Sequence, residues 1–92
     1  MIYLLLVTFD LRSPAEEYDA FFDAMLSDYD HYHISDTCYL VDAASARPMR
    51  DRLKECISPT DRLFVTELIP QGCCGQLPDK AKAWLKDHLY KI

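Results

Sequence analysis

Glycine is scarce in this sequence of 92 residues, since it occurs only at Gly72 and Gly75. Two glycines cannot build the glycine-rich loop that cradles phosphate groups in many nucleotide-binding proteins. The sequence also lacks a nucleophile elbow and the cysteine–histidine signature of a thiol enzyme. These common catalytic motifs are therefore excluded, and any chemistry requires a different arrangement of side chains.

Positive charge is also in short supply. Lys and Arg together number 10, whereas Asp and Glu number 15, so the net charge is −5 at pH 7. A negative protein is not drawn to nucleic acid or to anionic lipid by its overall charge, and contact with nucleic acid would need a local basic patch or a metal ion. No apolar run approaches the length that spans a bilayer, so no membrane segment is expected.

The cysteines do not form a recognisable framework. The sequence contains four, at positions 38, 56, 73 and 74, with neither a CxxC motif nor a disulfide spacing. We expect no leader segment and interpret the cysteines as reduced thiols of a cytoplasmic protein. Cys73 and Cys74 indicate a tight loop, or reactive thiols if they are exposed. Together with His31 and His33, which share a strand face, they could bind zinc or copper; the alternative is that both histidines are aromatic-polar residues of an edge strand.

The first ten residues form the clearest pattern, an apolar segment from Ile2 to Phe9 that ends at Asp10. Apolar and polar residues do not alternate in it, so both faces of the predicted strand must be covered. Apolar and aromatic residues make up 50% of the chain, more than a small domain can hide on one side of a sheet. We therefore predict an apolar self-association surface and a homodimer.

Predicted helices and strands follow one another in a definite order. Ser13 and Pro14 are typical of a helix N-cap and a first helical position, and Ser45 is a candidate N-cap for a second helix. The predicted elements are a strand at 2–9, a helix at 14–26, a hairpin with strands at 31–34 and 37–41, a helix at 47–57, a strand at 62–69, a loop at 70–75, and a last helix that opens at Pro78.

This order predicts an α+β protein in which residues 1–92 form a single ferredoxin-like domain. Two split strand–helix–strand units give a βαββαβ sandwich, whose four-stranded antiparallel sheet has the spatial order four, one, three, two. Both crossover helices lie on one face of that sheet. The other face is left for a second subunit or for the added C-terminal helix, with its inner residues Ala81, Trp84, Leu85, His88 and Leu89.

Four segments carry a family resemblance. They are Val7-Thr-Phe-Asp-Leu11, Thr37-Cys-Tyr-Leu-Val41, Asp61-Arg-Leu-Phe-Val-Thr-Glu67 and the ending from Leu77-Pro to Ala83-Trp84-Leu85. In this element order they resemble the CRISPR-associated Cas-two and VapD-like superfamily, and most of all its SinR-like small proteins. The resemblance spans nearly the whole chain.

The resemblance implies a ferredoxin-like homodimer from a phage-defence or mobile-element setting. It also implies a role for Asp10, because the matching aspartate of the Cas-two family comes near its dimer mate and has been proposed as a metal-binding nuclease residue. Other members of the family are non-catalytic adaptors. This sequence departs from the family in its acidity, its C-terminal tail and the lack of an arginine-rich first helix.

Three aspartates are candidates for a metal site. In the predicted topology Asp10, Asp36 and Asp61 lie at the same edge of the sheet, and Asp10 meets its copy across a dimer. Carboxylate oxygens are ligands for Mg²⁺ and Mn²⁺, and such a cluster could activate water for phosphodiester cleavage. The alternative is that Asp36 and Asp61 are turn and strand-start residues whose carboxylates bond the local backbone.

The candidate phosphate-binding residues are Arg12, Arg50 and Lys54. Arg50 and Lys54 lie along one side of the second predicted helix, and Arg12 precedes the first. Asp51 and Glu55 interrupt this basic face, so an ordinary solvated surface is the alternative.

Two functional hypotheses follow, and the sequence leaves open whether the protein is an enzyme. The first is a homodimeric interaction or adaptor module with a protein partner, in a phage-defence or mobile-element context. The second is a metal-dependent endonuclease for RNA or DNA, with Asp10 at the dimer interface and Mg²⁺ or Mn²⁺ as cofactor. A toxin-like ribonuclease resembling VapD is a third hypothesis that no residue selects.

Overall fold

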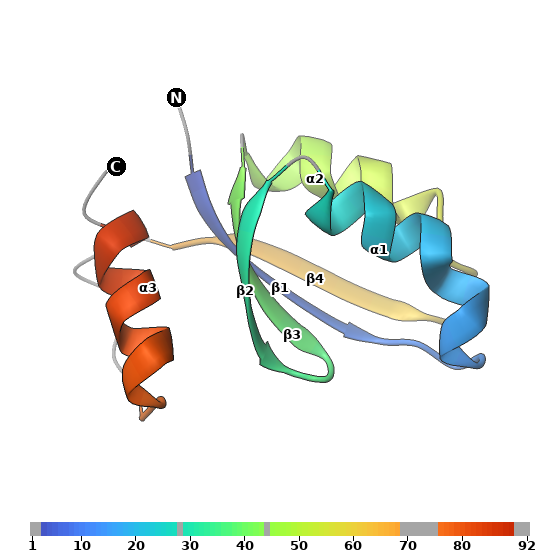
Figure 1. Ribbon diagram of the computed structural model, residues 1–92. Coiled ribbons are helices and arrows are strands. Elements are labelled where there is room, and N and C mark those ends of the chain that lie inside the picture. The colour runs from blue at the N-terminus through green and yellow to red at the C-terminus, as the bar shows by residue number, and fades with distance from the viewer. Residues whose placement is uncertain (1–2, 28, 44, 69–75, 90–92) are drawn as a thin grey trace.

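The computed structural model describes residues 3–27, 29–43, 45–68 and 76–89. Figure 1 shows a twisted antiparallel sheet with helices α1 and α2 on one face and helix α3 on the other side. The predicted α+β class and the four-stranded antiparallel sheet are confirmed.

Helices and strands have the following bounds. The strands are β1 (Tyr3–Asp10), β2 (Asp30–Ser35), β3 (Cys38–Ala43) and β4 (Arg62–Glu67). A 3₁₀ helix, η1 (Ala15–Tyr18), runs into α1 (Asp19–Leu26), and α2 (Ala46–Lys54) and α3 (Asp79–Leu89) are the remaining helices of the described residues. The predicted elements thus exist, with shifted ends; the predicted loop at 70–75, which contains Cys73 and Cys74, lies outside the described residues.

The strands are ordered β2-β3-β1-β4, and every neighbouring pair is antiparallel. β1 therefore lies between β3 and β4, so that Val7 faces Tyr39 on one side and Val65 on the other. Because side chains alternate along a strand, Leu5, Val7 and Phe9 point to one face of the sheet. Leu4, Leu6, Thr8 and Asp10 point to the other.

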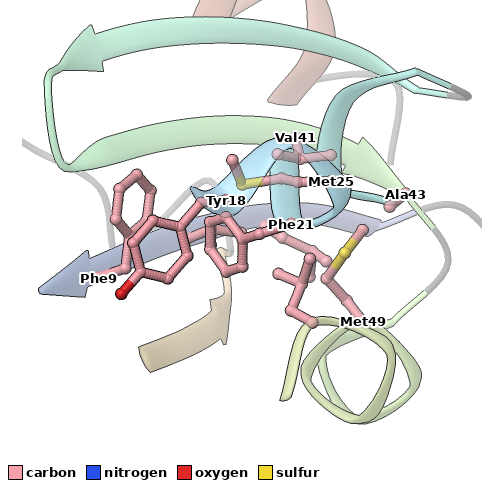
Figure 2. Close-up of a cluster of buried hydrophobic side chains, with 10 residues drawn as sticks. Phe9, Tyr18, Phe21, Met25, Val41, Ala43 and Met49 are labelled. Carbon is pink, nitrogen blue, oxygen red and sulfur yellow. The ribbon is translucent and has the colours of Figure 1, made fainter. Parts of the chain in front are cut away.

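The main core lies between the sheet and the helices α1 and α2. Phe21 and Met25 of α1 and Met49 of α2 meet Phe9 and Val41 of the sheet, as Figure 2 shows. The Phe9 and Phe21 rings pack edge to face, with centroids 5.1 Å apart. Burying one such side chain contributes about 1.5–3 kcal/mol to folding. This cluster is the reason that the apolar stripe of α1 faces the sheet.

The opposite face of the sheet is covered over one part of its length. Leu4 and Leu40 are buried there beneath Trp84 and Leu85 of α3. Further toward the Asp10 end of β1, the side chain of Phe64 is 62% exposed. The last helix therefore covers only the Leu4 end of the face that the sequence analysis leaves open.

The predicted N-cap at Ser13 is wrong, and the predicted N-cap at Ser45 is confirmed in position but makes no side-chain capping bond. Pro14, not Ser13, occupies the N-cap position of η1, and the Glu17 N–H donates to the Pro14 carbonyl at 3.0 Å. Ser45 does stand at the N-cap of α2, but its side chain makes no capping bond. Instead, Oε2 of Glu67 accepts the Ala46 N–H at 3.0 Å, so a strand residue distant in sequence supplies the cap.

In the described part of the chain, no helix is long and apolar enough to cross a membrane. The longest, α3, spans Asp79–Leu89 and carries charged residues along its length.

Candidate functional site

The end of the sheet that carries Asp10 collects most of the candidate residues. Asp10 lies opposite Arg62 in the pairing of β1 with β4. The Phe9 N–H donates to the Thr37 carbonyl at 3.0 Å, which brings the β2–β3 turn with Asp36 to the same end. The Arg12 N–H donates to Oδ1 of Asp61 at 2.7 Å. The three candidate aspartates therefore share one end of the sheet.

Asp10 itself is exposed and ion-paired. Its Oδ2 lies 3.3 Å from Nη2 of Arg12, and the two side chains are 58% and 54% exposed. An exposed pair of this kind contributes at most about 1 kcal/mol and is weakened by salt. The candidate phosphate ligand Arg12 is therefore ion-paired with Asp10, which is the carboxylate that the metal hypothesis requires.

The Asp61 carboxylate accepts hydrogen bonds from three separate segments of the protein. Its Oδ1 accepts the Arg12 N–H, its Oδ2 accepts the Ser58 N–H at 3.0 Å, and the Tyr18 hydroxyl donates to both oxygens at 3.0 Å. Hydrogen bonds from the backbone of Arg12 and then of Ser58 lower the pKa of Asp61. The carboxylate ties the segment after β1, the turn before β4 and η1 together, as the structural interpretation of this residue requires.

The three aspartates do not form a metal cluster within one chain. Among the described residues, no group of three or more His, Cys, Asp or Glu side chains could hold a metal ion. The two candidate histidines of β2 also have other partners: Nδ1 of His31 lies 3.1 Å from the Tyr29 carbonyl, and His33 stacks flat on Tyr39 with centroids 4.4 Å apart.

Two of the three candidate phosphate ligands line one cavity. Arg50 and Lys54 border a cavity of about 360 Å³ whose apolar wall includes Ile57 and Leu63. Two observations reduce its attraction for anions. Nη2 of Arg50 lies 2.6 Å from a carboxylate oxygen of Asp51, and Asp61 is also part of the wall. Positive and negative charges are therefore nearly balanced around the cavity, as in the solvated-surface interpretation.

The sheet face that the sequence analysis leaves for a second subunit carries a patch whose residues sequence reasoning did not name. The Phe64 patch consists of Leu6, Thr8, Cys38, Phe64 and Thr66, which share one sheet face in the strand register. All except Phe64 are partly buried. Burial also raises the pKa of the Cys38 thiol, so the patch is uncharged at neutral pH.

The sequence held one signal for this patch. Leu63, Phe64 and Val65 are consecutive apolar residues in a strand, so at least one must point away from the helix-side core. Leu63 and Val65 pack against that core and Phe64 does not. Because side chains alternate between the two sheet faces along a strand, the register identifies which of the three residues is exposed.

Comparison with known proteins assigns no family to this arrangement. A scan against protein-family models, a search of curated proteins and a search of solved structures each found no match for the chain.

Proposed function

We propose that the protein is a small homodimeric interaction or adaptor module with the ferredoxin-like fold of the Cas-two and SinR-like proteins. Support for this fold comes from the strand order β2-β3-β1-β4, which reads four, one, three, two from the β4 edge. The position of α1 and α2 on a single face of the sheet supports it as well. The phage-defence or mobile-element context, and a protein partner of the dimer, belong to the same proposal.

The Phe64 patch is the observation that carries the proposal. Phe64 is a large aromatic side chain that is 62% exposed, and it is surrounded on the sheet by Leu6, Thr8 and Thr66. Exposed aromatic residues within a flat apolar surface are typical anchors of protein interfaces. Burying Phe64 against a partner would complete the second layer that α3 begins.

The local charges at the border of the patch favour a second copy of the chain as the occupant. Asp10 and Arg62 lie directly opposite one another at the border of the patch, and Arg12 pairs with Asp10, so the border carries charges of both signs. A two-fold axis through the patch lets the acid of each copy face the base of the other. A strongly acidic or basic partner would find no matching excess of charge there, and the net charge of −5 disfavours nucleic acid.

Replacing Phe64 by Asp tests this interface. We expect wild-type protein at micromolar concentration to sediment with twice the 10.7 kDa mass of one chain. Phe64→Asp should raise the dissociation constant at least about tenfold, because it removes an apolar anchor and buries a charge. Ala20→Asp is the matched control, since it adds the same charge at an exposed position of α1 on the opposite side of the sheet.

The mass of the wild-type protein in sedimentation shows whether it is a dimer and therefore tests the proposed interface. A monomer at every accessible concentration, or a dimer that Phe64→Asp and Ala20→Asp weaken equally, contradicts the assignment of this face. Circular dichroism of both variants controls for loss of the fold, which the exposure of the two sites makes a small effect.

A metal-dependent endonuclease with Asp10 as ligand is the second candidate. The observation in its favour is that Asp10 lies on the same sheet face as Phe64. A dimer through that face would bring two Asp10 carboxylates into one interface, where a divalent cation could bridge them.

Asp10→Asn separates the two candidates. The adaptor proposal expects no cleavage of RNA or DNA in Mg²⁺ or Mn²⁺ that depends on Asp10. Cleavage by the wild type that disappears in Asp10→Asn and persists in the control Asp19→Asn, at an exposed position of α1, would establish the nuclease instead.

A further inference from the structure

Helix α3 is held on the sheet by a small number of side chains. Ala81 is 1% exposed, and the partly buried Trp84 and Leu85 pack against Leu4 and Leu40. The Trp84 ring also contacts Tyr32 of β2, with centroids 6.0 Å apart. This apolar contact is much smaller than the core beneath α1 and α2, so an added polar contact has a large influence on it.

That polar contact is made by His88, which is 8% exposed. Its Nδ1 lies 2.7 Å from the Trp84 carbonyl, and its Nε2 is bonded to Oδ2 of Asp30 on β2. The imidazole ring stacks on Trp84, with centroids 3.7 Å apart and planes 14° from parallel. Both ring nitrogens are thus directed at oxygen atoms of the protein.

The chemistry of these two oxygens selects the charged form of His88. A backbone carbonyl and an ionised carboxylate can only accept hydrogen bonds, and a neutral imidazole has one N–H to donate. Only the imidazolium donates to both at once. Loss of one proton therefore leaves one ring nitrogen with its lone pair facing an acceptor.

The charged groups around His88 also favour its protonated form. Asp30 approaches from β2, and Asp42 of β3 lies directly opposite Asp30 in the strand pairing. Among the described residues, Tyr32 of β2 is also titratable, and its ring contacts Trp84. The described charged residues of α3 itself are all exposed: Asp79, Lys80, Lys82, Lys86 and Asp87. An imidazolium bonded to Asp30 and near Asp42 also offsets the mutual repulsion of the two carboxylates.

The pKa values agree with this geometry. Burial alone would lower the pKa of His88, but the bonds to Asp30 and to the Trp84 carbonyl, with the charges of Asp30 and Asp42, outweigh it and raise the pKa above its ordinary 6.5. The hydrogen bond from His88 in turn lowers the pKa of Asp30.

We propose that α3 is a pH-sensitive cover, which the protonated His88 fastens to Asp30 of β2 and which is released from the sheet when His88 loses its proton. Release uncovers Leu4 and Leu40 and so extends the Phe64 patch along β1. The cover regulates dimer formation only if the proposed function is correct, but its own opening does not depend on that function.

The direction of the pH effect follows from linkage. The pKa of His88 is higher in the docked state than in the undocked state, so the docking free energy that it contributes is fully present below pH 6.5. It is lost as the pH rises through the raised pKa. A rise of one in the pKa corresponds to a tenfold larger docking constant for the protonated form.

Hydrogen exchange and an NMR titration test the cover. We expect the α3 amides of the wild type, after correction for the intrinsic rate, to exchange at least about tenfold faster at pH 8.5 than at pH 5.5. The amides of β1 and β3 should keep their protection, which also shows that the fold persists. The ring protons of His88 should titrate above 6.5, and emission from Trp84, the single tryptophan of the chain, should change with the same midpoint.

His88→Gln is the decisive variant, with His31→Gln as its control because His31 is an exposed histidine of β2. His88→Gln should exchange α3 amides at the fast rate at both pH values, and His31→Gln should behave like the wild type. The cover is contradicted by equal protection of α3 at both pH values in the wild type, or by a pH response that survives in His88→Gln.

The Phe64→Asp background separates this inference from the proposed function. A pH response of α3 in that variant supports the cover whatever the oligomeric state. If the wild type is a dimer but the protection of its α3 amides does not change with pH, the proposed cover is contradicted and the proposed dimer is not. If the wild type is a monomer whose α3 amides do respond to pH, only the proposed dimer is contradicted.

Discussion

At the scale of single residues, Asp61 shows how one carboxylate serves structure where the sequence also allows a metal ligand. Its partners are Arg12, which precedes it by 49 positions, together with Tyr18 and Ser58. The Ser58 bond could be anticipated from the turn pattern before β4. The other two could not, because no local spacing indicates which distant N–H or hydroxyl will reach a carboxylate.

Asp61→Ala is therefore expected to destabilise the fold more than Asp36→Ala does. Asp36 lies exposed in the β2–β3 turn at the same end of the sheet and is the matched control. Loss of the Asp61 carboxylate leaves the N–H groups of Arg12 and Ser58 without their acceptor, and thermal unfolding at pH 7 should show a midpoint several degrees lower.

The pH dependence of that difference has a definite sign. Because the folded pKa of Asp61 is lowered from 3.8, its contribution is present above pH 3.8 and is lost as the pH falls through the lowered value. The gap in melting temperature between wild type and Asp61→Ala should thus narrow under strongly acidic conditions. A constant gap from pH 7 to pH 2 would show that the ionised form is not what stabilises the fold.

At the scale of helices and strands, patterns of apolar residues were better guides than patterns of polar ones. The stripe through Phe21 and Met25 of α1 faces the core, and Ala81 and His88 face the sheet from α3, as predicted. Apolar periodicity works because every element of a small domain must bury one side. The predicted N-cap at Ser13 was wrong because Pro14 occupies that position, whereas Ser45 does stand at the N-cap of α2 but Glu67, a tertiary partner, accepts the Ala46 N–H in place of its side chain.

The contact between α3 and the sheet likewise depends on a tertiary partner that sequence patterns do not identify. Periodicity predicts that His88 faces inward, but its bond to Asp30 joins residues 58 positions apart. A buried histidine on an apolar face gives no indication of which carboxylate it will meet. The cover proposed for α3 therefore depends on the fold, and the sequence alone could not have predicted it.

At the scale of the whole molecule, charge and shape would act together on the proposed self-association. The protein measures about 34 × 28 × 21 Å along its principal axes and carries a net charge of −5. The screening length is about 30 Å in 10 mM salt and about 8 Å in 0.15 M salt. In 10 mM salt each copy of the chain therefore interacts electrostatically with nearly the whole charge of the other copy. In 0.15 M salt it interacts only with nearby charged groups.

We accordingly expect the proposed dimer to tighten when salt is added. Raising NaCl from 10 mM to 150 mM should lower the dissociation constant several-fold, because screening removes repulsion between like-charged copies and leaves burial of the neutral Phe64 patch unaffected. Sedimentation equilibrium at both salt concentrations measures the change. A dimer that weakens in salt would instead be held mainly by ion pairs such as one between Asp10 and Arg62.

The bond from Ala46 to Glu67 has a consequence for the order in which the chain can fold. The first amide of α2 obtains its acceptor, and β1 its second neighbour, only when residues 62–67 of β4 are available. During synthesis the earlier segments must remain outside the ribosome with an unfinished sheet until β4 emerges. Stable folding should therefore begin only after β4 has been synthesised, and chaperones that protect exposed strand edges would have their main opportunity before that point.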